Sequence, residues 1–396
     1  MADSLKRRIG LGLLTAYGVG VMIGAGIYVL VGAVAADAGV NAPLSFLLAG
    51  LIAAPTALSY SEFSTRIPEA AGEAAFVEKG FGVPMLGLIV GLCIVAAGTV
   101  SASAVLSGGV GYLLSLINMP EVLAIVLVGV LLCGVAIIGV LESLALAAIF
   151  TVIEVIGLAL VVWAGFAAPT TVDYTMPASL AWGGITAGAV LAFFAFIGFE
   201  DIVNMAEEVD RPERTMPRAI LLSLVITTAV YALVSWAAVR AVPLGALGES
   251  RQPLALVWQM GMGGEARFLS AIAVFAALNG VLAQIVMASR VLYGLGRRHR
   301  SLGVFHQAHS KLGTPVLATV LIGAAVIAGA LALDLATLAE ATSSILLSVF
   351  VIVNLALIAM KRKSPEAKFR VPMAVPIFGF AAAGMALVLS ITGVGA

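Results

Sequence analysis

The sequence is poor in charged residues and nearly free of cysteine. Charged side chains make up 11% of its 396 residues, hydrophobic side chains make up 62%, and the mean hydropathy is +1.14. A soluble domain of this length cannot bury that much apolar surface, which excludes a water-soluble globular protein. The two cysteines, Cys93 and Cys133, both fall within apolar runs, so a disulfide framework is excluded.

Several functional signatures are also missing. The 21 Lys and Arg residues balance the 21 Asp and Glu residues, which argues against nucleic acid as a partner. We find no nucleotide-binding loop, no metal-ligand cluster and no nucleophile with a matching base. The sequence therefore predicts a protein that is not an enzyme and needs no cofactor. It has no ATP-binding part of its own and gives no sign of an obligatory protein partner.

Long apolar runs dominate what remains. A run of about 20 apolar residues is enough to cross about 30 Å of hydrocarbon. The third run is long enough to be tilted or to extend past the lipid. We predict an all-α integral membrane protein that forms a single transporter domain over residues 1–396. Its eleven predicted transmembrane helices lie at 12–35, 43–66, 84–117, 122–140, 143–168, 181–205, 218–241, 267–294, 315–333, 336–360 and 372–394.

The distribution of Lys and Arg among the loops predicts the orientation in the membrane. With a cytoplasmic N-terminus, 18 of the 21 basic residues face inward, and only Arg240, Arg251 and Arg267 face outward. We therefore expect a multi-pass protein of the cell (inner) membrane, with the lipid bilayer as its surroundings and the N-terminus in the cytoplasm. The first run has no small-residue cleavage site and is expected to be a retained span.

Five acidic residues lie inside apolar runs: Glu62, Glu154, Glu200, Asp201 and Glu340. A charge at bilayer depth costs at least about 2.5–3.5 kcal/mol, so each one needs a partner or a purpose. Glu62 and Glu340 lie near the ends of their runs. This favours an interfacial position for Glu62 and a structural role for Glu340. Glu154 is mid-span, with no basic residue within reach along its own helix. It is either a proton site, because desolvation favours the neutral form, or a neutral hydrogen-bonded link between helices.

Two of the apolar runs contain stretches that oppose helix formation. "GVGVMIGAGIY", residues 18–28, has four glycines in nine residues, and each glycine costs roughly 1 kcal/mol relative to alanine in a helix. "FFAFIGFED" in the sixth run places Gly198 just before two adjacent acids. If the helix resumes after Gly198, Glu200 and Asn204 share one helical face.

These stretches lie five spans apart, in segments that cross the membrane in opposite directions. Alone, the Gly20 and Gly24 pair would indicate close helix packing. Interrupted segments at matching places in two inverted halves instead indicate a transporter binding site near the midplane. Exposed N–H groups at a half-helix suit a carboxylate, and exposed carbonyls suit an ammonium, provided that both face a cavity rather than lipid.

The glycine-rich stretch, together with "PEAAGEAAFVEKGFG", "FFAFIGFEDIVNMAEEVDRPERTMPRAI" and "ASRVLYGLGRR", resembles the amino acid–polyamine–organocation (APC) superfamily of permeases. The similarity runs in order over essentially the whole chain. It implies a 5+5 inverted-repeat core with discontinuous helices 1 and 6. The first repeat would span 12–168, the second 181–360, and an accessory helix 372–394. Many members have twelve spans, whereas we count eleven here.

The same resemblance implies roles for individual positions. N–H groups around Gly24, Ala25 and Gly26 would bind a substrate carboxylate. Carbonyls from both interruptions would bind the α-ammonium, and Phe194 would close over the substrate as an aromatic gate. The predicted substrate-binding residues are Ile23, Gly24, Ala25, Gly26, Ile27, Phe194, Ala195, Ile197 and Gly198.

Coupling and substrate are less constrained by the sequence. Glu154 stands where some proton-coupled relatives have a lysine, so the lysine mechanism cannot be transferred. Glu154, with Glu200 as a second candidate, would carry H⁺ or help to coordinate Na⁺; without coupling the protein would be an exchanger. The third run contains no acid and the surroundings of the site are apolar. We predict proton-coupled symport of neutral amino acids by alternating access. The alternatives are an exchanger for basic amino acids or polyamines, and a channel.

Overall fold

The computed structural model describes residues 9–23, 26–67, 72–139, 144–171, 180–206, 208–309, 312–364 and 366–392. Regular structure in these ranges is helical, apart from one isolated parallel bridge between Ile9 and Val209. The α-helices are α1 (Leu11–Ile23), α2 (Ile27–Ala38), α3 (Ala42–Arg66), α4 (Gly72–Phe81), α5 (Pro84–Leu113), α6 (Glu121–Ile138), α7 (Leu144–Ala167), α8 (Trp182–Phe193), α9 (Pro212–Ala241), α10 (Leu244–Glu249), α11 (Pro253–Met262), α12 (Arg267–Arg298), α13 (Val316–Ala332), α14 (Leu335–Lys363) and α15 (Ala374–Thr392). The 3₁₀ segments are η1 (Gly39–Asn41), η2 (Phe194–Phe196), η3 (Glu200–Met205) and η4 (Arg300–Phe305).

The described residues contain nine segments that are long and apolar enough to cross a membrane. This confirms an all-helical, multi-pass membrane protein. The count differs from the eleven predicted runs in two places. One 40-residue segment, Ile27–Arg66, takes in both α2 and α3, and α13 has only 17 residues. α1 is shorter still, at 13 residues, because its run is interrupted after Ile23.

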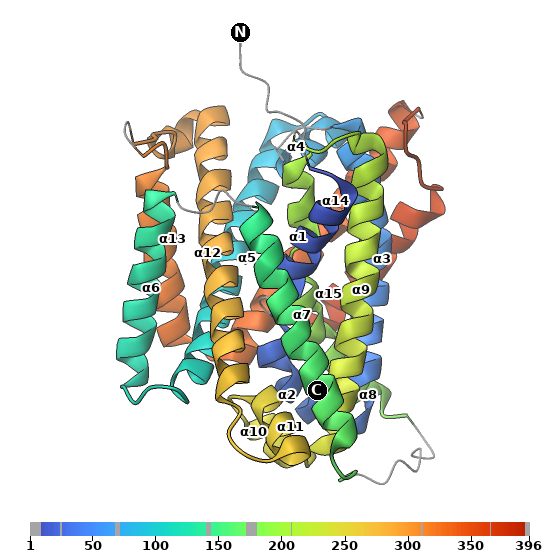
Figure 1. Ribbon diagram of the computed structural model, residues 1–396. Coiled ribbons are helices and arrows are strands. Elements are labelled where there is room, and N and C mark those ends of the chain that lie inside the picture. Colours follow the sequence, from blue (N-terminus) through green and yellow to red (C-terminus); the bar gives the residue numbers. More distant parts are fainter. Residues whose placement is uncertain are drawn as a thin grey trace.

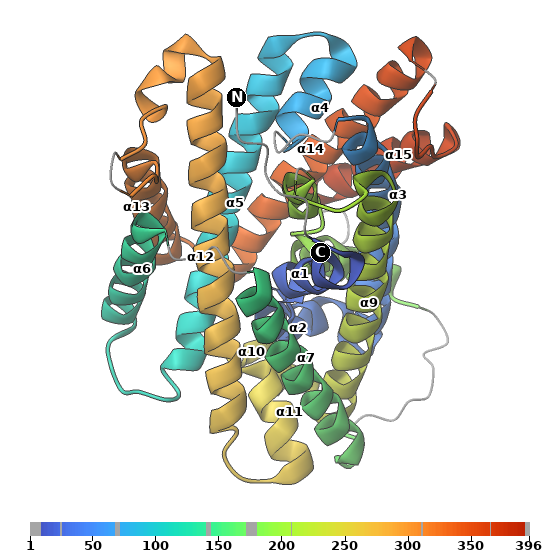
Figure 2. The same ribbon diagram turned by 45° about the horizontal axis from the view of Figure 1, so that its top comes forward.

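The short helices α1 and α2 lie in the middle of the bundle, surrounded by longer helices (Figures 1 and 2). α1 packs against α7 and α9, and α2 packs against α8. α3 pairs with α9, α5 pairs with α12, and α6 pairs with α13 at one side of the molecule. α4 lies at one end of the bundle, and α10 and α11 lie at the opposite end (Figure 1).

Hydrogen bonds and ion pairs fix the charged residues at the two ends. At the α4 end, Arg298 pairs with Glu78 of α4 at 3.1 Å. At the other end, Arg240 donates to the main-chain carbonyl of Gly165 at 2.7 Å, and Arg251 pairs with Glu121 at 2.7 Å. The three arginines predicted to face outward were Arg240, Arg251 and Arg267, and at least two of them are thus anchored by neighbouring helices.

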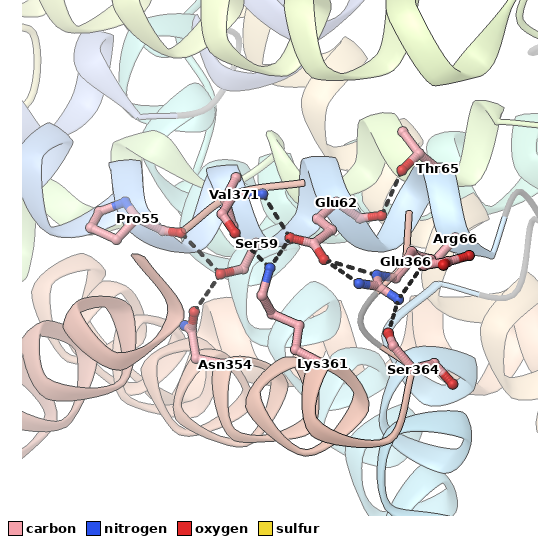
Figure 3. Close-up of polar contacts among 10 residues, drawn as sticks. All are labelled: Pro55, Ser59, Glu62, Thr65, Arg66, Asn354, Lys361, Ser364, Glu366 and Val371. Atoms are coloured by element: carbon pink, nitrogen blue, oxygen red, sulfur yellow. Dashed lines mark hydrogen bonds and ion pairs between the residues drawn. The ribbon is translucent and has the colours of Figure 1, made fainter. Parts of the chain in front are cut away.

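A buried polar cluster, which we call the polar lock, ties α3 to α14 and to the chain leading into α15 (Figure 3). Its members are Glu62, Arg66, Asn354, Lys361 and Val371. Glu62 accepts from Arg66 Nε at 2.9 Å through one carboxylate oxygen, and from Lys361 Nζ at 2.7 Å through the other. The main-chain N–H of Val371 adds a further bond to the second oxygen at 2.9 Å. The side chain of Glu62 is fully buried and paired with Lys361. The sequence predicted an interfacial position for Glu62 but not this ion pair.

The rest of the polar lock extends the same connection. Lys361 also donates to the Val371 carbonyl at 2.6 Å, and Arg66 donates to the Ser364 carbonyl at 2.8 Å. Asn354 accepts from Ser59 at 2.7 Å and donates to Thr56 at 2.9 Å. Both oxygens of the Glu62 carboxylate therefore have partners: one accepts from Arg66 on the same helix, and the other accepts from Lys361 of α14 and from the main chain of Val371.

Candidate functional site

The first interruption separates α1 from α2. α1 ends at Ile23, and α2 begins at Ile27 with Gly26 as its N-cap; Gly24 and Ala25 lie outside the described residues. The first turn of any α-helix has N–H groups without intrahelical acceptors. No side chain in the described part of the chain caps them in α2, while the Gly26 carbonyl accepts from the N–H of Leu30 at 2.9 Å. The break therefore presents the positive end of a 12-residue helix.

The second interruption follows α8. The chain tightens into the 3₁₀ turn η2, then extends at Ile197 (φ −58°, ψ 131°). It turns at Gly198, whose φ of +122° is a conformation that favours glycine. The condition that would place Glu200 and Asn204 on one helical face is not met, because the chain continues after Gly198 as the 3₁₀ segment η3. With three residues per turn, positions 200 and 204 do not stack on one face, and the Asn204 side chain lies outside the described part of the structure.

Glu200 acts locally in the second interruption. One of its carboxylate oxygens accepts the N–H of Gly198 at 3.0 Å, and its side chain is 4% exposed. The hydrogen bond satisfies a main-chain donor that the unwound helix would otherwise leave without a partner. This contact places the Glu200 carboxylate beside the turn itself.

The two interruptions touch each other. A Cβ atom added to Gly26 would overlap Ala195, and one added to Gly198 would lie 2.6 Å from Val21. Val21 therefore lies beside Gly198, and Gly26 lies beside Ala195. The two segments thus run in opposite directions where they touch. Glycine at these two positions is what allows backbone to approach backbone.

Tyr231 of α9 connects both interruptions and was not predicted from the sequence. Its hydroxyl lies 2.7 Å from the carbonyl oxygen of Met22 and 2.8 Å from that of Ala195. A hydroxyl has one proton, so it donates to only one of these carbonyls at a time. The ring is held edge-on by Phe46 and Phe196, which fixes the hydroxyl in place. In the sequence the only signal was a lone tyrosine in an apolar run.

The described members of the predicted site are shielded from solvent. Ile23, Ile27 and Ala195 are fully buried, and Phe194 is 1% exposed. The carbonyl of Phe194 accepts the N–H of Ile197 at 3.2 Å within the turn. The structure therefore brings these predicted residues together around the touching interruptions, in a closed arrangement.

Glu154 of α7 lies next to the first interruption. Its side chain is 3% exposed, and its Oε2 has no hydrogen-bond partner among the described residues. The Tyr28 hydroxyl donates to its main-chain carbonyl at 3.0 Å. The carboxyl is also close enough to the hydroxyls of Tyr28 and Tyr231 to interact electrostatically with both. An acid of α7 is thus coupled to the residues that hold the interruptions.

The chemistry available at this site is that of helix ends. The described part of the chain contains no group of three or more His, Cys, Asp or Glu residues able to hold a metal ion. The start of α2 offers N–H groups, and the ends of α1 and α8 offer carbonyls. Such a pair of oppositely polarised ends suits a molecule that carries both an anionic and a cationic group.

Comparison with known proteins gives consistent matches over the length of the chain. The family model described as "Amino acid permease" matches residues 9–395. Branched-chain amino acid permease BcaP of Bacillus subtilis (strain 168) is 29% identical, over 92% of this chain and 83% of the relative. Methylthioribose transporter of the same organism is 29% identical over 98% and 88%, respectively. Cationic amino acid transporter 4, vacuolar, of Arabidopsis thaliana is 30% identical over 89% and 63%.

Proposed function

Because this chain belongs to the amino acid permease family, we propose that it takes up neutral amino acids together with protons, by secondary active transport with alternating access. The observation that carries the proposal is the pair of touching interruptions in the buried centre of the bundle. A broken helix in lipid is unfavourable unless its free main-chain groups serve a ligand or a partner. The chain keeps two such breaks side by side.

The proposed architecture is a 5+5 inverted repeat of residues 12–168 and 181–360, followed by an accessory helix at 372–394. On this assignment, eleven spans result when α13 counts as a span and α3 is separated from α2. Three pairs of helices that would be equivalent in the two repeats pack against each other, namely α3 with α9, α5 with α12 and α6 with α13. Contact between equivalent elements is expected near a two-fold axis in the membrane plane, and it supports the repeat.

The proposed substrate site uses both helix ends. The N–H groups from Gly24 to Ile27 would hold the substrate carboxylate. The carbonyls of Ile23, Ala195 and Ile197 would accept from its ammonium, with Phe194 as the gate. The Tyr231 hydroxyl already lies at two carbonyls of these breaks, so we infer that it holds them in register whether or not a substrate is bound.

A neutral side chain fits the surroundings of the site best. Met22, Ile23 and Phe196 are fully buried and apolar. The acid nearest to the second interruption, Glu200, is engaged by Gly198. A cationic side chain would therefore compete with the main chain for that carboxylate, which favours a neutral amino acid over a basic one.

Glu154 is the proposed coupling residue. An ionised carboxylate with an unsatisfied oxygen is strongly disfavoured at bilayer depth, whereas a protonated one is tolerated. The Tyr28 hydroxyl donates to the main-chain carbonyl of Glu154 and interacts electrostatically with its carboxyl, so the charge on Glu154 acts at the start of α2. Na⁺ remains the alternative ion, because the free oxygen is also a hard ligand. For orientation we propose a cytoplasmic N-terminus in the cell membrane, with α4 on the cytoplasmic side.

The decisive experiment is uptake of labelled compounds into proteoliposomes, with an imposed proton gradient, with a sodium gradient and with neither. The panel should include branched-chain and cationic amino acids and methylthioribose, which the relatives' names mention. Accumulation of neutral amino acids only with the inward proton gradient supports the proposal. Uptake that needs preloaded amino acid and ignores both gradients would identify an exchanger instead.

A further inference from the structure

Three carboxyl groups come together at the α4 end of the bundle, outside the proposed substrate site. Glu73 belongs to α4, and Glu200 and Asp201 begin η3. Glu73 is 5% exposed and Glu200 is 4% exposed. The Glu73 carboxyl interacts electrostatically with Asp201, and Glu200 interacts with both other acids. Acids from a helix at the end of the bundle and from the interrupted segment therefore meet in one largely buried space, in which Glu73 and Glu200 are buried and Asp201 is partly exposed.

A buried hydroxyl faces this group from α3. Tyr60 is fully buried, and its hydroxyl has no partner in hydrogen-bond geometry among the described residues. The hydroxyl interacts electrostatically with all three carboxyls and lies nearest to Glu73. Phe76, Phe199 and Phe350 all pack edge-on against the Tyr60 ring and hold it in place. An unsatisfied donor is thus held toward three acceptors.

Positive charge is scarce around the group. On α1, Tyr17 interacts with Asp201 and also with Arg290, which is exposed on α12. On α3, Arg66 belongs to the polar lock, where it pairs with Glu62. Glu78 of α4 pairs with Arg298 at the surface, and α4 carries Lys79 in its last turn. On α9, the exposed cations Arg214 and Arg218 lie near the start of the helix.

Three ionised carboxylates in such a space would repel one another without a buried cation to offset them. Protonation of one or more of them removes the repulsion, and the Tyr60 hydroxyl is placed to donate to a carboxyl that stays ionised. In line with this, burial raises the pKa of Glu73, which lies outside the spanning segments, from 4.5 to about 7.

We propose that Glu73, Glu200, Asp201 and Tyr60 form a proton-binding site, separate from Glu154, that holds η3 against α3 and α4 while it is protonated. Loss of the proton leaves like charges on the two sides of the contact between α4 and η3. Because η3 continues directly from the second interruption, deprotonation loosens this end of the interrupted segment. The consequence for transport rests on the proposed function, whereas the proton site itself does not.

The first test is thermal unfolding of the purified full-length protein as a function of pH. The unfolded chain releases the Glu73 proton near pH 4.5, whereas the folded protein keeps it up to about pH 7. The folded state binds more protons in this window, so stability falls as pH rises through it and then levels off. Glu73→Gln should flatten this decline. Glu78→Gln is the matched control on the same helix and should keep the wild-type profile.

Tyr60→Phe keeps the packed ring and removes only the hydroxyl. The hydroxyl favours the ionised form of Glu73, so the variant should extend the decline in stability to higher pH. An unchanged profile in both Glu73→Gln and Tyr60→Phe overturns the proposal. If Glu73→Gln does not fold, the shift of the Tyr60→Phe profile decides alone.

The second test is hydrogen–deuterium exchange of peptides covering residues 197–206 at mildly alkaline pH. Glu73→Gln mimics the protonated acid, so these peptides should exchange more slowly than in the wild type. Equal exchange overturns the loosening of η3. Neither measurement needs transport, so a failed uptake experiment with both expected results removes only the link to transport and leaves the proton site intact.

Discussion

The polar lock and the interrupted helices treat buried polar groups in opposite ways. In the polar lock, the Glu62 carboxylate receives Arg66, Lys361 and a main-chain N–H, and both of its oxygens are used. At the interruptions, one oxygen of Glu154 has no hydrogen-bond partner among the described residues, and a single Tyr231 proton serves two carbonyls. The fully paired region suits a permanent connection between helices. The under-paired region suits a site whose contacts change during a transport cycle.

Breaking the polar lock should have the largest effect on stability. Lys361→Met leaves the fully buried Glu62 charge with fewer donors, and removing one partner of a buried ion pair costs roughly 3–5 kcal/mol. We expect a loss of about 3 kcal/mol, at the lower end of that range, because Arg66 still contacts Glu62. The free energy of unfolding of the purified variant, compared with that of the wild type, measures this loss. Lys363→Met, an exposed neighbour, is the control, and equal losses in both variants would contradict the assignment of Lys361.

A larger residue at the contact between the two interruptions should have the second-largest effect on stability. In Gly26→Ala the new methyl group overlaps Ala195, and overpacking typically costs about 1–3 kcal/mol. Substrate binding should weaken roughly tenfold or more if the breaks must separate to relieve that strain. Binding to the purified protein tests this. Gly12→Ala, in open space on α1, is the control and should bind normally. Normal binding by Gly26→Ala would contradict the site.

Removing the Tyr231 hydroxyl, whose proton serves two carbonyls, should have an intermediate effect on stability. Tyr231→Phe keeps the ring between Phe46 and Phe196 but leaves the carbonyls of Met22 and Ala195 without their donor. Unsatisfied buried acceptors cost roughly 1–3 kcal/mol, so we expect a loss of stability in that range together with weaker substrate binding. Tyr293→Phe, whose ring lies beside His306 near the end of α12, should change neither quantity. Wild-type binding by Tyr231→Phe would show that the bridge is dispensable.

Glu154→Gln should have the smallest effect on stability and the most specific effect on transport. The glutamine resembles the protonated acid, so the free energy of unfolding should change by less than the roughly 1–3 kcal/mol of an unsatisfied polar group. Uptake should no longer be driven by an imposed proton gradient, because the residue no longer exchanges a proton. Uptake with and without the gradient measures this, with Glu62→Gln as the contrasting variant that should lose stability. Gradient-driven accumulation that persists in Glu154→Gln would return Glu154 to a structural role.

The sequence predicted the parts of the fold that depend on local composition. Apolar runs gave the membrane helices, and glycines marked both places where helices break, because glycine opposes helix formation wherever it sits. The change from α to 3₁₀ geometry after Gly198 could not be predicted, since an i, i+4 pattern presupposes the helix that it is used to test. Nor could the length of α1, which depends on where the neighbouring segment approaches.

The missed residues depend on distant partners. Tyr231 lies 209 residues from Met22, and Lys361 lies 299 residues from Glu62. A tyrosine in an apolar run or a lysine at a span end has an ordinary local explanation, so neither stood out. Glu154 was recognised because an acid without a nearby base in a membrane helix has no such explanation. The same reasoning singled out Glu200 and Asp201 but not Glu73, whose burial follows only from the packing of α4.

Val371 is held at both of its main-chain polar groups: its N–H bonds Glu62 of α3, and its carbonyl bonds Lys361 of α14. A residue gripped in this way transmits displacement between the two helices and the chain that enters α15. α15 is therefore expected to move together with α3 and α14 rather than with α1. A spectroscopic label on α15 would keep a constant distance to one on α3, even in a cycle that changes its distance to α1.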